Sequence, residues 1–452
     1  MSILRIEEPT AEPPATPRRG RVAWALHHMR DSYVQIFAGQ LLSGVVALGA
    51  NVMMARALSP TGRGEVALML QIVYLSTQVL LLGTERSFVA GFHGAAPAAA
   101  VRAYARLLVV PCTLGLFAVT TFVLLAPERY DPGPTLVALV ASYAVVDAII
   151  LASRAVSLVI GRVHDFLRCR LIESVAVVAI MLALFFGHVT SPGVWVFAYL
   201  IAGAVPTGIY IAFWLRLPTT AAARPVTVAQ RRLARREGLT LFPAAISNMA
   251  MLRVDRLALP ILASTAGLGL YTSVATMTEL LAWPLRAFAD SRLGKWRAAH
   301  HDGGLRVRPL VIAAVVYTVV VAPILAAGIY VLIVPVFGAR YAPAKEVVLP
   351  LVAAAGLYAI SRVSLGVLVA KGHSGYVSAA EICGFAVSFV GYVLLIPHYG
   401  ILGAAYGSLV GYGACLVFAI VVSRFAERGA AATPVPAEPA RLAGETGVGR
   451  AP

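Results

Sequence analysis

Twelve runs of apolar residues constrain the fold of this chain more than any other feature of its sequence. Most are at least as long as the ~20 residues that a helix needs to cross the hydrocarbon core of a bilayer. Only 13% of the 452 residues are charged, against about 25% in a soluble domain. The sequence therefore predicts an all-α integral membrane protein with about 12 transmembrane helices. The runs cover residues 32–58, 65–90, 104–126, 134–158, 170–187, 194–215, 240–263, 268–288, 309–336, 347–370, 374–397 and 401–423.

Positively charged residues are concentrated in every second gap between these runs. Cytoplasmic loops carry an excess of Lys and Arg, so the asymmetry predicts a multi-pass protein of the cytoplasmic (inner or plasma) membrane with both termini in the cytoplasm. These loops account for the net charge of +16 without a nucleic-acid partner, and they are candidate contacts with membrane lipids. The basic gaps contain Arg102, Arg106, Arg162, Arg168, Arg170, Arg224, Arg231, Arg232, Arg235, Arg236, Arg292, Lys295, Arg297, Arg306, Arg308 and Lys371, whereas the alternate gaps contain only Arg63, Arg129, Arg340 and Lys345.

Matching residues in the two parts of the chain indicate an internal repeat. Glu173 follows Arg154 by 19 residues, and Glu381 follows Arg362 by the same number. Since each half would contain an even number of helices, the halves have the same orientation and form a parallel pseudo-repeat about an axis along the membrane normal. A second match relates Leu58-Ser-Pro-Thr-Gly-Arg-Gly64 to Ala263-Ser-Thr-Ala-Gly-Leu-Gly269.

The repeat divides the chain into two six-helix halves around a central cavity. We expect the binding site to lie at the interface between these halves. The predicted segments are a cytoplasmic N-terminal segment (1–30), a first six-helix bundle (31–216), a basic cytoplasmic linker (217–239), a second six-helix bundle (240–424) and a disordered cytoplasmic tail (425–452).

The stretch Met-Leu-Arg-Val-Asp-Arg at residues 251–256 places three charges inside the seventh apolar run. A charge near the bilayer centre costs ~2.5–3.5 kcal/mol on insertion scales. Arg253, Asp255 and Arg256 are therefore tolerable only where they face other helices or a water-filled cavity and find partners there. This stretch predicts that the seventh helix lines a polar path through the protein.

Other charges lie inside or at the ends of the apolar runs, and two interpretations fit them. Arginine forks bind phosphate or carboxylate oxygens, and buried carboxylates carry protons or bind Na⁺. Alternatively, acids and arginines neutralise one another and lock helices together. Arg56 and Arg63 are expected to anchor the outer interface. The remaining intramembrane charges are Glu85, Arg86, Asp147, Arg154, Glu173, Glu279, Arg286, Arg362 and Glu381.

The sequence has no motif for catalysis, nucleotide hydrolysis or metal binding. There is no G-x-x-x-x-G-K-[ST] loop and no H-E-x-x-H motif. The four cysteines lack the spacing of a metal site. We therefore expect no catalytic residue, no metal and no cofactor.

Four segments, spread over both halves, resemble the polysaccharide/oligosaccharide-lipid flippases (Wzx-like) of the multidrug/oligosaccharidyl-lipid/polysaccharide exporter superfamily. They are residues 55–68 (ARALSPTGRGEVAL), 266–271 (AGLGLY), 336–344 (VFGARYAPA) and 396–405 (IPHYGILGAA). The resemblance covers about residues 31–424 and rests on helix ends and turns. It implies two six-helix bundles around a central cavity that opens alternately to the two sides of the membrane.

The resemblance also implies a cargo and a set of site residues. The cargo would be undecaprenyl-pyrophosphate-linked oligosaccharide, moved to the outer leaflet for surface polysaccharide biosynthesis, with a polysaccharide polymerase or ligase as candidate partner. The best matches to pyrophosphate-binding arginines are Arg86, Arg154, Arg253 and Arg256. The charges inside the spans themselves add Arg362 as a candidate pyrophosphate contact and Asp147, Asp255 and Glu279 as candidate coupling carboxylates.

Three alternatives remain open. A cation-coupled drug or small-molecule antiporter of the same superfamily would use carboxylates as its main contacts, whereas arginines outnumber acids within these spans. A polytopic glycan-processing membrane enzyme would need a sizeable outer loop or an acidic cluster at the outer face, and the outer loops here are short. A non-transporting scaffold related to flippases would have a collapsed cavity.

Overall fold

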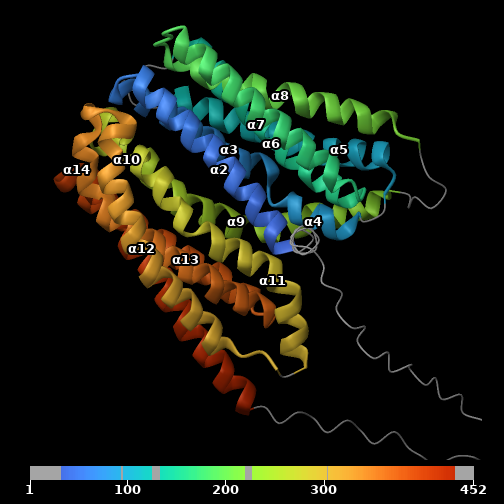
Figure 1. Cartoon of the computed structure of the whole chain (residues 1–452). Helices are drawn as coiled ribbons and strands as arrows, with labels where there is room; N and C mark the ends of the chain where they lie inside the picture. The colour runs from blue at the N-terminus through green and yellow to red at the C-terminus, as the bar shows by residue number, and fades with distance from the viewer. Residues whose placement is uncertain (1–31, 93–94, 125–132, 219–225, 303, 433–452) are drawn as a thin grey trace, which may run out of the picture.

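The computed structural model describes residues 32–92, 95–124, 133–218, 226–302 and 304–432 (Figure 1). In these ranges the chain is helical and contains no β-strand. The helices are α2 (Ser32–Ala57), α3 (Pro60–Leu81), α4 (Thr84–Gly91), α5 (Pro97–Leu124), α6 (Pro134–Val159), α7 (Val163–Phe186), α8 (Pro192–Arg216), α9 (Val228–Leu262), α10 (Thr265–Thr278), η2 (Glu279–Leu281), α11 (Trp283–His301), α12 (Val307–Phe337), η3 (Ala339–Val347), α13 (Val348–Ala370) and α14 (Ser374–Ala432).

The predicted all-α fold is confirmed, and the twelve apolar runs correspond in order to these helices. Eight helices of the described chain are by themselves long and apolar enough to cross a membrane. The element α14 holds the last two runs, because the backbone leaves the helical conformation at Gly400 (φ 53°, ψ −123°). Side chains on the outside of the bundle are apolar: Val319 and Ile324 of α12, for example, are 65% and 68% exposed. Such a surface suits lipid rather than water.

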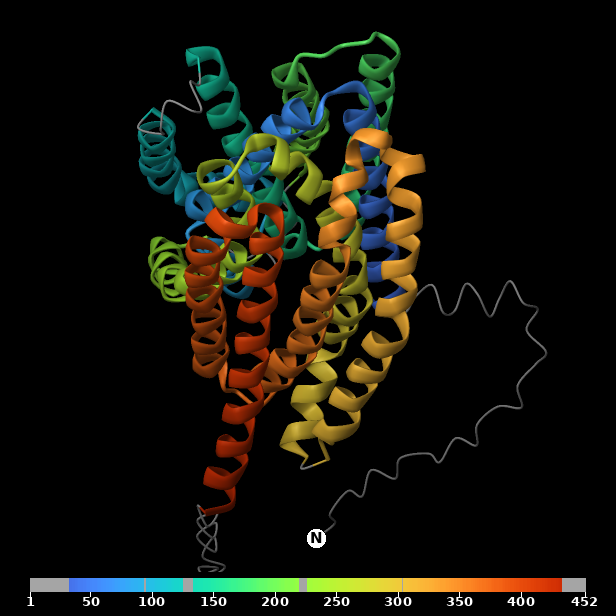
Figure 2. The same ribbon diagram turned by 90° about the vertical axis from the view of Figure 1, so that its left-hand side faces the viewer.

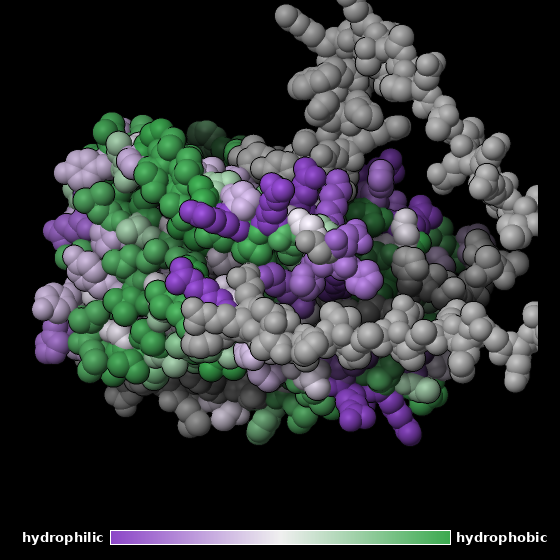
Figure 3. Space-filling model, turned by 90° about the horizontal axis from the view of Figure 1, so that it is seen from below, coloured by the Kyte–Doolittle hydropathy of each residue, from purple (hydrophilic) through white to green (hydrophobic). Residues whose placement is uncertain are grey.

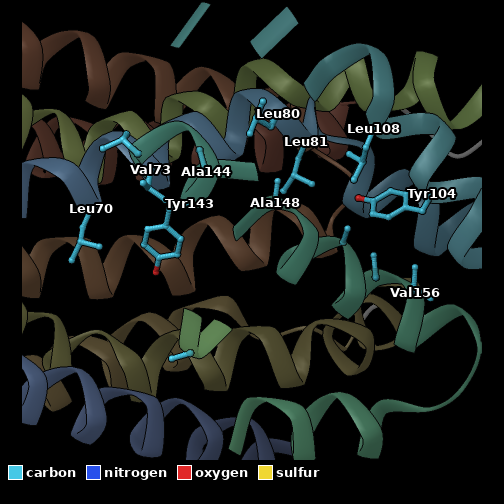
Figure 4. Packing of buried hydrophobic residues seen from close by; sticks show 14 of the residues in the cluster. Leu70, Val73, Leu80, Leu81, Tyr104, Leu108, Tyr143, Ala144, Ala148 and Val156 are labelled. Atoms are coloured by element: carbon cyan, nitrogen blue, oxygen red, sulfur yellow. The ribbon is translucent and has the colours of Figure 1, made fainter. Parts of the chain in front are cut away.

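Two groups of helices, each with its own apolar core, form the two halves. Figure 1 shows the blue-to-green helices α2–α8 on one side and most of the yellow-to-red helices α9–α14 on the other, with the beginning of α9 crossing to α4. Buried residues between Ala50 and Ala234 form the first-half core, which includes Val73 of α3 packed near Ala144 of α6 (Figure 4). Two further clusters fill the second half, mostly from residues 251–419.

The halves also touch each other and present a divided surface. Figure 2 shows α12 of the second half beside α2 of the first, the pair that meets at their ends through Arg56. From below, hydrophilic side chains gather on one part of the surface beside a broad hydrophobic area (Figure 3). A boundary of this kind is expected where a protein passes from lipid into water.

Two predicted spans are interrupted in ways that the apolar pattern did not indicate. The second run divides into α3 and α4 at Leu82 and Gly83, which have left-handed φ values of 46° and 68°. The eighth run is not one helix: α10 ends at Thr278, the 3₁₀ turn η2 follows, and α11 begins at Trp283. The second interruption directs Glu279 into the centre of the protein.

Part of the predicted basic linker is helical. The helix α9 begins at Val228 with a capping box between Thr227 and Gln230, so its first turns precede the predicted seventh span. They dock on α4, where the hydroxyl of Ser87 donates to the carbonyl oxygen of Ala234 at 2.7 Å. The first eight residues of the predicted tail continue α14, and the rest of the tail and the predicted segment 1–30 lie outside the described residues.

Candidate functional site

A cavity of about 340 Å³ lies between the two halves, as the parallel repeat predicts. Its wall is formed by α2, α3, α6 and α8 of the first half and by α9, α10 and η2 of the second. The central cavity, as we call it, is therefore built from parts that would move apart if the halves rocked. Its polar and charged wall residues include Arg63, Gln71, Tyr74, Asp147, Arg253, Arg256 and Glu279.

Two arginines of α9 share one carboxylate at the wall of the central cavity. The Nη1 group of Arg253 donates to Oε1 of Glu279 at 3.3 Å, and the Nη2 group of Arg256 donates to the same oxygen. The two arginines lie three positions apart on a helix and so share one face. Two guanidinium groups and one carboxylate leave this cluster with a net positive charge.

Arg253 also reaches across to the first half. Its Nη1 group lies 3.5 Å from Oε1 of Gln71, and its guanidinium carbon lies 5.6 Å from the centre of the Tyr74 ring. Both partners belong to α3. A change in the distance between the halves would therefore change the surroundings of Arg253 directly.

The sequence predicted that Arg63 anchors the outer interface, and this prediction is wrong because the side chain is buried. It is 4% exposed and lines the central cavity, where its Nε group donates to Oδ1 of Asn51 at 2.7 Å. Its Nη1 atom is buried and has no hydrogen-bond partner among the described residues, and no carboxylate in those ranges lies within ion-pair distance. Arg63 is thus a cation of the cavity that has no acidic partner in the described part of the chain.

A sequence signal for Arg63 does exist in the spacing of its neighbours. Gln71, Tyr74 and Gln78 follow it on α3 at intervals that place all four on one face of the helix. A polar face on a helix long enough to cross the membrane indicates a cavity or a helix contact rather than lipid. The position of Arg63 beside a turn concealed this signal.

Asp147, a predicted coupling carboxylate, lies at the wall of the central cavity. Its Oδ2 atom accepts a hydrogen bond from the hydroxyl of Thr77 at 2.8 Å. Within the part of the chain that the structure describes, it has no cationic partner within ion-pair distance. Asp147 is therefore an acid of the cavity wall that is available to a bound cation or proton.

Asp255 points away from the central cavity into the second half. It lines a smaller cavity of about 80 Å³, where its Oδ2 atom accepts a hydrogen bond from the hydroxyl of Tyr271 at 2.6 Å. Its Oδ1 atom accepts a hydrogen bond from the backbone N–H of Arg256 at 2.8 Å. Arg253, Arg256 and Glu279 line both cavities, so they form the wall between Asp255 and the central cavity.

The structure places the other predicted arginines elsewhere. Arg154 is exposed and lies 4.0 Å from Glu85, and Arg362 is paired with Glu381 at 3.0 Å inside the second half. Neither arginine lines the central cavity or the smaller one. Arg86 lies on α4, and its side chain is outside the described part of the structure.

The Arg362–Glu381 pair connects three helices of the second half. Oε1 of Glu381 on α14 accepts a hydrogen bond from Nη1 of Arg362 on α13. The same oxygen accepts a second hydrogen bond, at 3.0 Å, from the side-chain amide of Asn248 on α9. The equivalent residues of the first half do not pair, because Glu173 pairs with Arg170 and Arg154 does not reach it. The geometry of Arg362 thus fits the helix-locking interpretation.

We expect Arg362→Ala to destabilise the protein by about 3–5 kcal/mol, because it leaves the buried carboxylate of Glu381 without its cation. Thermal unfolding in detergent would measure this loss. Replacing both partners with apolar residues, as Arg362→Met with Glu381→Leu, should recover much of the stability and retain activity. A double variant as stable as the original protein but inactive would show that Arg362 has a functional role instead.

Comparisons of the sequence with known proteins identify no relative. No protein-family model matches the chain. No curated protein matches it either.

Comparison of structures does identify the fold. The chain matches an inward-facing conformation of a multidrug resistance MATE family transporter of the MOP superfamily with a TM-score of 0.69 and 15% identity, over 89% of this chain and 99% of that one. It matches the lipid II flippase MurJ in an inward closed conformation with a TM-score of 0.66 and 11% identity, over 86% of this chain and 87% of that one. It matches an outward-facing conformation of a multidrug resistance MATE family transporter of the MOP superfamily with a TM-score of 0.56 and 14% identity, over 89% of this chain and 95% of that one.

The chain therefore has the fold of the MOP-superfamily transporters. Its helices surround a central cavity that contains both arginines and acids, and its outer surface is apolar enough for a multi-pass membrane protein.

Proposed function

We propose that this protein is a flippase that moves undecaprenyl-pyrophosphate-linked oligosaccharide from the inner to the outer leaflet of the cytoplasmic membrane by alternating access. One observation carries the proposal: Arg253 and Arg256 converge at the central cavity, where Glu279 is the only carboxylate of the described residues within ion-pair distance of their guanidinium groups. The fold, which is shared with a MATE family transporter and with the lipid II flippase MurJ, supports the same conclusion.

The charge of the central cavity favours an anionic cargo. Its wall contains three arginines, Arg63, Arg253 and Arg256, against the two acids Asp147 and Glu279. Guanidinium groups bind phosphate oxygens with two parallel hydrogen bonds, and they lose less hydration energy than an ammonium group would. A pyrophosphate entering the cavity would therefore find charged hydrogen-bond donors from both halves.

Glu279 occupies the position that a phosphate would take between the two arginines. A pyrophosphate carries more charge and more acceptor oxygens than a carboxylate, so it can displace Glu279 from Arg253 and Arg256. The released carboxylate would then be available to a proton or a cation, together with Asp147 and Asp255. In this scheme, cargo binding and ion binding are coupled because the cargo displaces Glu279 from the two arginines and so makes its carboxylate available to the ion.

The size of the cavity limits what it holds at one time. A volume of about 340 Å³ lies near the lower end of the ~300–1,000 Å³ of small-molecule pockets. It suits a pyrophosphate with one attached sugar. We propose that the polyprenyl tail stays in the lipid and that a longer glycan enters as the halves separate.

A cation-coupled antiporter is the second candidate function, favoured by the position of Asp147. This acid faces the central cavity without a cationic partner in the described ranges, as a binding site for an organic cation would require. An antiporter should lose activity on Asp147→Asn and keep it when Arg253 and Arg256 are replaced. A flippase should show the opposite order of sensitivity.

The decisive test is to delete the gene and determine on which leaflet lipid-linked oligosaccharide accumulates. A flippase predicts accumulation in the inner leaflet and loss of the surface glycan, and analysis of the accumulated lipid names the sugar. Normal surface glycan with altered resistance to cationic drugs would overturn the proposal in favour of the antiporter. Isolation of the protein with a polymerase or ligase would test the proposed partner.

We expect Glu279→Gln to bind a soluble pyrophosphate-lipid analogue about tenfold more tightly, because the variant lacks the charged carboxylate that competes for the two arginines. A hydrogen bond to such a charged group contributes ~1.5–3 kcal/mol. Transport should slow, since the cargo is released less readily. Titration of the purified protein measures the affinity, with Glu173→Gln, which lies outside the cavity, as the matched control. Unchanged or weaker binding by Glu279→Gln would contradict the displacement scheme.

A further inference from the structure

The two halves meet through a pair of helix ends that are equivalent in the repeat. The helix α3 begins after Ser59, whose hydroxyl oxygen accepts the N–H of Gly62 at 3.2 Å. The helix α10 begins after Ser264, whose hydroxyl oxygen accepts the N–H of Gly267 at 3.0 Å. The same cap at both sites, in segments that the sequence already matched, shows that the repeat extends to these turns.

Each helix end touches the other backbone at a glycine. A Cβ atom on Gly64 would lie 1.9 Å from the carbonyl oxygen of Thr265, and one on Gly269 would lie 2.0 Å from the carbonyl oxygen of Pro60. Pro60 and Thr265 are equivalent in the repeat, as are the two glycines. The contact is therefore reciprocal, and it leaves no room for any side chain at either glycine.

A second link closes the same end of the protein. At the end of α2, the Nε group of Arg56 donates to the carbonyl oxygen of Val336 at 2.7 Å, and its Nη2 group donates to that of Pro335. These two carbonyls lie in the last turn of α12, so the link joins the first half to the second. Carbonyls at a helix C-terminus have no partner within the helix, which favours a cation there.

The reciprocal contact of Gly64 and Gly269 lies directly against the end of the central cavity. Gly64 adjoins Arg63, which lines that cavity, and Thr272 of α10 lines it one turn beyond Gly269. The distribution of positive charge predicts that this end of the bundle faces outward. The two backbones therefore touch between the central cavity and the end of the bundle that is predicted to face outward.

We propose that the reciprocal contact of Gly64 and Gly269, which we call the glycine contact, is the closed outer gate of this protein, with Arg56 as an auxiliary link. Because backbone meets backbone, the closed form is tight and depends on the absence of two Cβ atoms. The higher TM-score with an inward-facing transporter (0.69) than with an outward-facing one (0.56) agrees with a gate that is closed here. The proposal rests on the alternating access of the proposed function but not on its cargo.

Alanine is the sharpest probe of this gate. In an ordinary helix position, Gly→Ala improves helix propensity, so Gly64→Ala and Gly269→Ala should not weaken α3 or α10 themselves. The added Cβ would instead force the helix ends apart and favour the outward-open form. Gly62→Ala is the matched control in the same turn, because its Cβ would lie 3.5 Å from the nearest atom, an ordinary contact.

The readout is the accessibility of one cysteine in the central cavity. The four native cysteines are replaced, and Thr276→Cys, at the cavity wall, is labelled with a membrane-impermeant maleimide from the outer side of cells or right-side-out vesicles. We expect Gly64→Ala and Gly269→Ala each to label about tenfold faster than the parent protein, as overpacking destabilises the closed form. Gly62→Ala should label at the parent rate.

The outcomes separate the gate from the cargo. Parent labelling rates in both glycine variants would overturn the gate, whatever the protein transports. Faster labelling in a protein that exports no lipid-linked glycan would support the gate and contradict the proposed cargo. If the alanine variants do not accumulate, Arg56→Ala tests the same end without a new contact, and unchanged outer labelling in that variant would also overturn the proposal.

Discussion

Replacing both Arg253 and Arg256 with alanine is expected to abolish export of the lipid-linked glycan while the protein remains in the membrane. The change removes two of the three guanidinium groups at the central cavity. Hydrogen bonds to charged groups contribute ~1.5–3 kcal/mol each, so losing two contacts should weaken pyrophosphate binding by more than about 100-fold. Surface glycan and the amount of protein in isolated membranes are measured side by side.

A third substitution separates binding from damage to the fold. In the double alanine variant, Glu279 is left as a partly buried carboxylate without a cation, which could by itself destabilise the protein. Adding Glu279→Gln removes that charge. If the arginines bind cargo, the triple variant recovers stability but stays inactive. Full export by the double variant, or recovery of export by the triple variant, would contradict arginine capture.

A second large effect is expected from Arg63→Ala. Arg63 is a buried cation without an acidic partner among the described residues, and one of its nitrogens makes no hydrogen bond there. Its removal strands no carboxylate, so stability should be unchanged or improved. Binding of the pyrophosphate-lipid analogue should weaken at least about tenfold, because one charged contact is lost. Loss of binding without loss of stability distinguishes Arg63 from Arg362.

Two variants control this measurement. Arg63→Lys retains the charge without the planar fork, and intermediate affinity is expected if the fork matters. Arg102→Ala removes an exposed arginine that donates to the carbonyl oxygen of Ala98 in its own helix, and it should bind as the original protein does. Equal affinity for the analogue in Arg63→Ala and Arg102→Ala would exclude Arg63 from the site.

The position of the seventh span was predictable from its charges, and the partners of those charges were not. The spacing of Arg253 and Arg256 places them on one face of a helix, and the cost of burying charge in lipid directs that face inward. Glu279 was one of several acids at comparable depth. It became their partner because the eighth span turns through η2 at that residue, an interruption that the apolar pattern does not reveal.

The sequence by itself determined the class of fold, and its count of about 12 spans agrees roughly with the helices of the structure. Apolar length decides whether a helix can cross a bilayer, and that property is local. It also determined where the repeat matches, at the turns that begin α3 and α10. It left Arg63, Arg253 and Arg362 as similar arginines in or beside apolar runs.

Only the tertiary structure decided which of these arginines faces a cavity. Helical periodicity states which residues share a face, but the neighbour that covers this face comes from a distant part of the chain. Arg362 pairs with Glu381 of the same half, whereas Arg253 and Arg63 both line the cavity between the halves. The close approach of Gly64 and Gly269 is of the same kind, because only the packing of the two halves brings these backbones into contact.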